Sequence, residues 1–294
     1  MHIIDAHSHY DPKIKNVDNI INQMTKNGIS KIALMSKVTK EPLYIKSHFL
    51  MGVQRELLQY NLTRKTLKIL DSSFHKSKGE WNPWYRKMLK KTKSFEILQI
   101  PDNDFVFETV NKYQSKFYGW LFLNPVLQNC NQEFEYYKKN KNLIGFKLHP
   151  FWHRYNLSEI DQIIPLARFN KLPILLHLGY EDPNYLINLI KSNYDVKFIL
   201  SHCAFPFYNN LLMKLKNSEN TMVDLSSHHV SKKIINKTVK LIGSQRCLFG
   251  VDDPYGGDEM GSKIINCISD LDIDNKMKED IFFRNFINLY EKRI

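Results

Sequence analysis

The sequence lacks several features that would place it in other classes of protein. No apolar run approaches the roughly 20 residues of a membrane-spanning helix, so we expect no membrane partner. No Gly-x-Gly-x-x-Gly follows a predicted strand, which argues against a dinucleotide-binding sheet. The 4 cysteines show no CxxC spacing, and free thiols in a reducing compartment explain them most simply. With a first strand predicted from residue 2, a signal peptide is not expected, and we predict a cytoplasmic protein.

Acidic residues are scarce in one part of the chain, and the positive charge is concentrated there. The 294 residues carry a net charge of +12. Residues 36–95 contain fourteen Lys or Arg and four Asp or Glu, which accounts for +10 of that total. A solvated helical face in a Lys-rich chain is the simplest explanation of this excess. Nucleic-acid binding and attraction of an anionic substrate are the alternatives.

Short apolar segments alternate with helical patterns along most of the chain. Eight segments rich in Ile, Leu and Val read as buried parallel strands, and seven of them precede a predicted helix. The predicted strands span residues 2–9, 29–35, 118–124, 143–148, 172–177, 196–202, 221–226 and 246–251. This repeat predicts an α/β protein with a (β/α)8 TIM barrel in a single domain, residues 1–294, and a doubly wound open sheet is the alternative.

One connection in this pattern is longer than the others. Residues 36–117 separate the second and third predicted strands, which exceeds a normal barrel connection. Helical periodicity over about residues 47–70 and again over 80–92 predicts a basic, mainly helical insertion rather than a separate domain.

Two histidines, at positions 7 and 9, end the first predicted strand. Alternate residues of a strand point to the same face, so both imidazoles can bind one cation. Two exposed histidines at a strand end are the alternative, and ligands at other strand ends decide between the two. Metal-binding or basic side chains do follow the fourth, fifth, sixth and eighth strands, where a barrel has its active site. They are Lys147 with His149, His177, His202 and Asp252.

Five motifs, each at or next to a predicted strand end, resemble those of the amidohydrolase superfamily of metal-dependent barrel hydrolases. The resemblance is strongest to the amidohydrolase-related branch that also contains the aminocarboxymuconate-semialdehyde decarboxylase type. The motifs are DAHSH at 5–9, GFKLHP at 145–150, PILLH at 173–177, ILSHC at 199–203 and FGVDDP at 249–254. They cover residues 1–35 and roughly 118–294, and they are specific for the superfamily but not for a substrate.

The resemblance implies a metal centre and a role for each residue. The implied metal ligands are His7, His9, His177 and Asp252. Asp252 often takes the proton of the attacking water, and His202 either acts on that water or binds a second metal. Lys147 matches a position that two-metal members may carboxylate to bridge their ions. An uncarboxylated Lys147 could instead hold a substrate anion, and one metal is favoured over two.

Three imidazoles and one carboxylate suit Zn²⁺ or another divalent first-row metal. Water bound to such an ion has a pKa of roughly 7 and yields hydroxide near neutral pH. We therefore predict a metal-dependent hydrolase that cleaves a C–N or C–O bond of a small molecule, with Asp252, His202 and Lys147 as catalytic residues. One alternative is a decarboxylase of the same family, with Arg154 or a basic residue of 36–95 binding the carboxylate. The other is a binding protein whose basic insertion faces nucleic acid, and a homo-oligomer is possible.

Other residues near the predicted mouth are most simply explained as loop or packing residues. The alternative is that they line a substrate pocket. The polar ones are His149, His153, Arg154, Tyr180, His228 and His229. Trp81, Trp84, Trp120 and Trp152 are expected to pack rather than to bind substrate. Cys203 has no evident partner base, so it is not expected to be a nucleophile.

Overall fold

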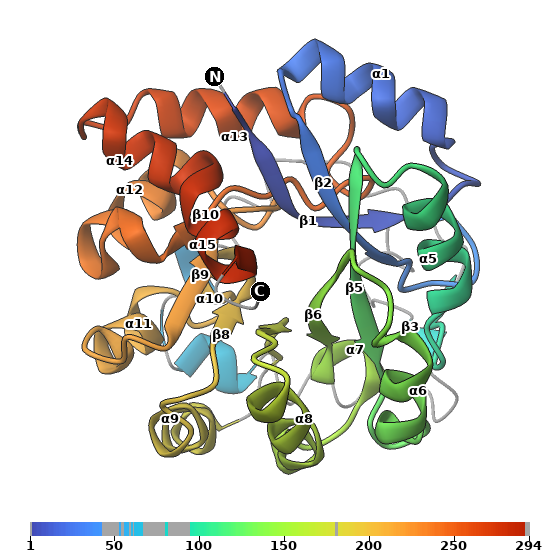
Figure 1. The fold of residues 1–294 in the computed structure, drawn as a ribbon. Helices are drawn as coiled ribbons and strands as arrows, with labels where there is room; N and C mark the ends of the chain where they lie inside the picture. The colour runs from blue at the N-terminus through green and yellow to red at the C-terminus, as the bar shows by residue number, and fades with distance from the viewer. Residues whose placement is uncertain are drawn as a thin grey trace, which may run out of the picture.

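The computed structural model describes residues 2–42, 53, 56–58, 60, 62–66, 80–81, 95–179 and 182–291. Eight strands pair side by side in parallel, in the order β1-β2-β5-β6-β7-β8-β9-β10 (Figure 1). Their bounds are β1 Ile4–Tyr10, β2 Lys31–Ser36, β5 Phe117–Leu123, β6 Leu143–Leu148, β7 Ile174–Leu176, β8 Phe198–Leu200, β9 Thr221–Asp224 and β10 Cys247–Leu248. Alternation of these strands with helices confirms the predicted (β/α)8 barrel.

The helices lie around the outside of the strands (Figure 1). Their bounds are α1 Val17–Asn27, α5 Asn103–Lys112, α6 Cys130–Tyr137, α7 Pro150–His153, α8 Ile164–Phe169, α9 Pro183–Ser192, α10 Ser201–Ala204, α11 Asn209–Leu215, α12 Lys232–Ile242, α13 Met260–Ser269, α14 Asn275–Glu279 and α15 Asn285–Glu291. Short 3-10 turns lie at Leu157–Gln162 and Ser244–Arg246, and a π turn lies at Asp280–Arg284. Over the described residues, the helices are too short or too polar to cross a membrane.

Hydrogen bonds between β1 and the segment after β10 nearly close the barrel. The Ala6 N–H donates to the Phe249 carbonyl over 3.0 Å, and the His9 N–H donates to the Asp253 carbonyl over 2.7 Å. The first strand and the last segment therefore lie side by side, although about 240 residues separate them in the sequence. This seam places the first motif, DAHSH at 5–9, beside the last motif, FGVDDP at 249–254.

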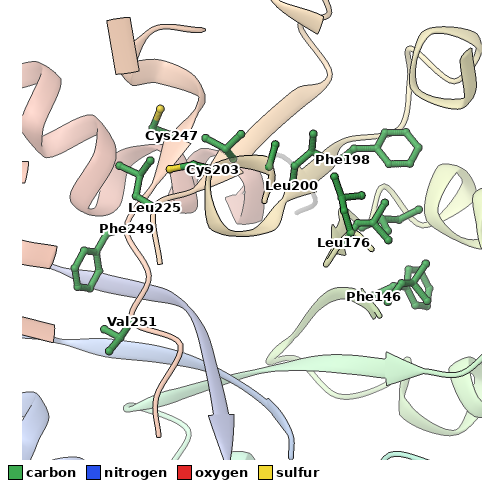
Figure 2. Close-up of a cluster of buried hydrophobic side chains, with 14 of the residues drawn as sticks. Phe146, Leu176, Phe198, Leu200, Cys203, Leu225, Cys247, Phe249 and Val251 are labelled. Atoms are coloured by element: carbon green, nitrogen blue, oxygen red, sulfur yellow. The ribbon is translucent and has the colours of Figure 1, made fainter. Parts of the chain in front are cut away.

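The hydrophobic core has two layers because strand side chains alternate between two faces. Every barrel strand sends residues into the interior, and examples are Ile4, Leu175 and Ile199. Alternate positions such as Leu176 and Leu200 face the helices instead, and Figure 2 shows part of this outer layer. Burial on both faces explains why the strand segments are almost continuously apolar in the sequence.

The end of the barrel opposite the histidines is filled by apolar side chains and covered by α15. Tyr118 of β5 packs on Phe286 and Tyr290, with ring centroids 5.5 and 5.0 Å apart. Trp120 lies in the barrel interior, where its indole N–H donates to the Ala6 carbonyl over 3.0 Å. The opposite end of the barrel, at the carboxyl ends of the strands, is where active sites lie in this fold.

About half of the predicted insertion, residues 36–117, falls outside the described residues. Residues 53, 56–58 and 62–66 are helical, within the helix expected over 47–70. The helix expected over 80–92 is wrong at its start, because Glu80–Trp81 forms a short strand, β3, paired antiparallel with β4, Phe95–Glu96. Backbone pairing to β4 competes with helix formation at these positions. Residues 82–92, including Trp84, lie outside the described part.

Candidate metal centre

A β-bulge in β1 turns His7 and His9 into the barrel. Ile4 and Ala6 face the interior core, and the pairing register with β2 shifts between Asp5 and Ser8. The extra residue of a bulge changes which side chains face inward, so His7 and His9 follow Ala6 on the inner face. Both rings are buried. The apolar start of the strand and its two histidines therefore share one face.

Asp5 holds this bulge from the outside of the strand. Its Oδ1 accepts hydrogen bonds from the backbone N–H of His7 (2.9 Å) and of Val251 (3.0 Å). Its Oδ2 accepts from the Ser8 hydroxyl over 2.5 Å. Burial raises the pKa of Asp5 to about 7 in spite of these donors. One carboxyl group thus shapes the histidine strand and joins it to the segment that carries Asp252.

His7, His9 and Asp252 come together at the mouth. Asp252 Oδ1 lies 3.7 Å from His7 Nε2 and 3.9 Å from His9 Nε2. The three ligand atoms lie within 4.8 Å of one another, which suits one ion about 2 Å from each. Among the described residues, His7 Nε2 is buried without a hydrogen-bond partner. A buried lone pair in this state is costly unless a cation or a donor occupies the point it faces.

Hydrogen bonds set the tautomers of the histidine rings. His9 Nδ1 donates to the Ser36 carbonyl over 2.6 Å, and His177 Nδ1 donates to the Leu178 carbonyl over 2.8 Å. A carbonyl can only accept, so Nδ1 carries the proton and Nε2 keeps a lone pair. Burial, helped by the positive charge of Lys147, lowers the pKa of His9 and of His177 to about 3. Both rings are therefore neutral near pH 7, as metal ligands must be.

His202 lies on the other side of Asp252. β8 ends at Leu200, two residues before the predicted strand end, and His202 adopts a left-handed conformation with φ of 56°. Its backbone N–H donates to Asp224 Oδ1 over 3.0 Å, which holds this turn. Its Nδ1 lies 2.8 Å from the Ser226 hydroxyl, and its Nε2 lies 3.8 Å from Asp252 Oδ2. Asp252 thus faces His7 and His9 with one oxygen and His202 with the other.

His177 lies beside this group but not within it. Within the described residues, the sets of metal-ligating atoms closer than 4.8 Å are His7–His9–Asp252 and His7–His202–Asp224. The His177 ring is 4.9 Å from the His202 ring, and it stacks on His149 at 4.0 Å. The structure therefore brings three of the four expected ligands together and places the fourth next to them.

Lys147 is fully buried in the barrel. Its Nζ makes a long hydrogen bond of 3.4 Å to the Ser201 hydroxyl. Burial lowers the pKa of Lys147 to about 8, while attraction to Asp224 and Asp252 opposes this effect. Burial likewise raises the pKa of Asp252, against the opposing charge of Lys147. Lys147 therefore places a basic group among the imidazoles and carboxylates of this site.

Among the other expected mouth residues, His149, His153 and His228 are buried and Arg154 is exposed. His149 lies over His177 and accepts at Nδ1 from the Trp152 N–H over 3.2 Å, so its proton is on Nε2. His228 lies against His229, with ring centroids 4.0 Å apart. Trp152 packs beside Phe122 and Tyr255, Arg154 lies over the Phe151 ring, and Tyr180 is outside the described residues.

Sequence reasoning missed Asp224 and Ser226. Asp224 ends β9 and bonds directly to His7, with Oδ2 2.8 Å from Nδ1. Ser226 connects Asp224 to His202. The available signal was a charged residue at the end of an otherwise buried strand, because such a group needs a partner.

Comparison with known proteins supports these observations. A sequence model described as amidohydrolase matches residues 92–291. No curated protein matches the chain. Among solved structures, a putative amidohydrolase from Staphylococcus aureus is 15% identical with a TM-score of 0.62, over 99% of this chain and 100% of that chain.

Two further structures are similar in fold. A dihydroxybenzoic acid decarboxylase from Polaromonas, with bound manganese and an inhibitor, is 14% identical with a TM-score of 0.58, over 100% of this chain and 98% of that chain. A probable 2-pyrone-4,6-dicarboxylic acid hydrolase from Acinetobacter baumannii is 12% identical with a TM-score of 0.61, over 99% and 100%. These similarities show the barrel fold, and both reaction types occur on it.

Proposed function

Because the chain belongs to the amidohydrolase family, we propose that it is a metal-dependent hydrolase of a small molecule. The meeting of His7, His9 and Asp252 supports this proposal. Two Nε2 lone pairs and one carboxylate oxygen face one point, and the His7 lone pair is buried without a partner among the described residues. Nitrogen and oxygen ligands in this combination suit Zn²⁺, Mn²⁺ or another first-row divalent ion.

The residues of the site fit such an ion. His7, His9 and Asp252 would hold it, and His177, whose ring lies 4.9 Å from the His202 ring, is the candidate for a fourth ligand. When bound, a divalent ion acidifies water and polarises a carbonyl group.

Asp252 and His202 are placed to handle the proton. Asp252 Oδ2 lies 3.8 Å from His202 Nε2, and His202 Nδ1 lies 2.8 Å from the Ser226 hydroxyl. A proton lost by the attacking water can be held between these two groups and then passed to the leaving nitrogen or oxygen. Burial of both groups excludes bulk water from this exchange.

Lys147 supports a proposal on the substrate. Its buried ammonium is a point charge that would bind an anionic group of the substrate. The similar structures include proteins named for dihydroxybenzoic acid and 2-pyrone-4,6-dicarboxylic acid, and both compounds carry carboxylates. We propose a small carboxylic acid as the substrate class. The same cation would also orient an acid for decarboxylation, the second candidate, in which the C–C bond breaks, CO₂ leaves and the substrate carbon takes up a proton.

Metal titration tests the proposal. The purified chain, stripped with chelator, is titrated with Zn²⁺ and Mn²⁺, and bound metal is measured by elemental analysis. We expect about one tightly held ion per chain and an affinity loss of at least about 100-fold in His9→Ala and Asp252→Ala. His2→Ala is the matched control, because His2 is exposed on the chain entering the same strand. A wild-type chain that binds no stoichiometric metal would refute the proposal.

Product analysis separates the two reactions. The metal-loaded chain is incubated with lactones, esters and amides that bear a carboxylate, and with hydroxybenzoic acids. Hydrolysis products without CO₂ support the hydrolase, and CO₂ release supports the decarboxylase. Lys147→Met, which keeps the length without the charge, is expected to raise KM for acids in either case.

A further inference from the structure

Asp224 lies behind the candidate metal centre and contacts two of its histidines. It is the last residue of β9, and its side chain is fully buried. His7 and His202 reach it from β1 and from the end of β8, on either side. Neither the resemblance to the family nor the comparisons assign it a role.

The two oxygens of Asp224 have different partners. Oδ2 lies 2.8 Å from His7 Nδ1. Oδ1 accepts from the His202 N–H over 3.0 Å, from the Ser226 N–H over 3.1 Å and from the Ser226 hydroxyl. These partners amount to four donors around one side chain. An ionised carboxylate can accept from all four, because it offers only acceptors.

This arrangement determines where the histidine protons are. Since Asp224 Oδ2 accepts, His7 Nδ1 must carry the proton, and Nε2 keeps the lone pair that faces Asp252. The Ser226 hydroxyl has one proton, and it donates that proton to Asp224. The hydroxyl oxygen must therefore accept from His202 Nδ1 over 2.8 Å, so the His202 lone pair is on Nε2 as well.

We propose that Asp224 is a positioning residue that sets the tautomers of His7 and His202 together, directly for His7 and through Ser226 for His202. The metal-binding nitrogen of His7 and the proton-accepting nitrogen of His202 are then both determined by one carboxylate. The use of these nitrogens rests on the function proposed above. The tautomers themselves do not, because they exist without metal or substrate.

A purely structural role for Asp224 is the alternative. Its Oδ1 accepts two backbone N–H groups, which alone would hold the left-handed turn at His202. Asp224→Asn separates the two roles. The amide oxygen can still accept those N–H groups, but the amide NH₂ would then face His7 Nδ1 and donate to it. His7 would have to move its proton to Nε2, the nitrogen that faces Asp252.

Nitrogen-15 NMR of histidine-labelled, metal-free protein reads the tautomers directly. In the wild type we expect His7 and His202 to be protonated at Nδ1. Asp224→Asn should move the His7 proton to Nε2 and weaken Zn²⁺ binding roughly 10- to 100-fold. Ser226→Ala should change the His202 signals alone and leave Zn²⁺ affinity within about 2-fold, while Ser226→Thr should restore them.

Asp11→Asn is the matched control, because Asp11 is also buried near the end of β1 but bonds to a backbone N–H and to no histidine. It should leave both tautomers and the Zn²⁺ affinity unchanged. The proposal is overturned if wild-type His7 is protonated at Nε2, a result that needs no variant to fold. It is also overturned if Asp224→Asn lowers thermal stability but keeps the His7 tautomer and the Zn²⁺ affinity. A wild type that binds no Zn²⁺ but shows the expected tautomers would refute the proposed function and not this inference.

Discussion

His153 should make the stability of the fold depend on pH in a defined window. The side chain is buried, and its Nε2 donates to the Leu98 carbonyl over 3.2 Å. Among the described residues, its Nδ1 is buried and has no partner, so a second proton there would have no acceptor. Burial lowers the pKa of His153 to about 4, and the charge of Lys147 adds to this effect.

The size and sign of the effect follow from this shift. In the unfolded chain the pKa of His153 is near its ordinary value of 6.5. Between pH 6.5 and pH 4 the unfolded state binds a proton that the folded state does not bind, so stability falls as the pH falls. The stabilisation from the neutral ring is complete above pH 6.5. His153 should account for a loss of about 2 kcal/mol between pH 7 and pH 5, and of about 3 kcal/mol by pH 4.

Urea unfolding of the metal-free chain, followed by circular dichroism at pH 7, 6 and 5, measures this loss. His153→Gln keeps an N–H donor for Leu98 but does not titrate. The wild type should lose about 2 kcal/mol more than this variant between pH 7 and pH 5. His2→Gln, at an exposed position, should behave like the wild type. Equal losses in the wild type and His153→Gln would refute the reasoning, because they would show that the ring protonates equally well in both states.

Three further perturbations test the packing that supports the site. Gly145→Ala should cost about 1–3 kcal/mol in urea unfolding, because its Cβ would lie 2.5 Å from the backbone oxygen of Pro173; unchanged stability would contradict this contact. Asn103→Ala should cost about 2–4 kcal/mol in the same assay, since the amide bonds both the N–H and the carbonyl of one β5 residue; a loss below about 0.5 kcal/mol would contradict it. A thiol reagent should label Cys267 in the native chain but not Cys203, because burial raises the pKa of the Cys203 thiol; rapid native labelling of Cys203 would refute its burial.

The barrel and the mouth were predictable from the sequence because they depend on local patterns. Apolar strands buried on both faces, alternating with helices, have few architectures available. Once the barrel is expected, a polar residue at a strand end must lie at the mouth. The equal facing of His7 and His9 follows from strand periodicity alone. For these reasons the fold could be predicted, and Asp252 and His202 could be placed near the two histidines.

The features that the sequence did not predict depend on contacts between distant segments. The bulge at Asp5 is held by Val251, 246 residues away, and no local pattern predicts it. The early end of β8 has the same origin, because His202 turns left-handed where its N–H meets Asp224. Left-handed conformations of non-glycine residues are set by tertiary contacts and not by propensity. Asp224 itself escaped prediction because its histidine partners, His7 and His202, come from β1 and from the turn after β8.

Two carboxylates face the same two histidines of this site from opposite sides. In front, Asp252 faces His7 with one oxygen and His202 with the other, at 3.7 and 3.8 Å. Behind, Asp224 faces the same two rings, directly and through Ser226. The hydrogen bonds on the Asp224 side, direct for His7 and through Ser226 for His202, hold both rings, so each Nε2 lone pair stays on the Asp252 side. Under the proposed function, a change at either carboxylate should therefore act on His7 as a metal ligand and on His202 as a proton acceptor at once.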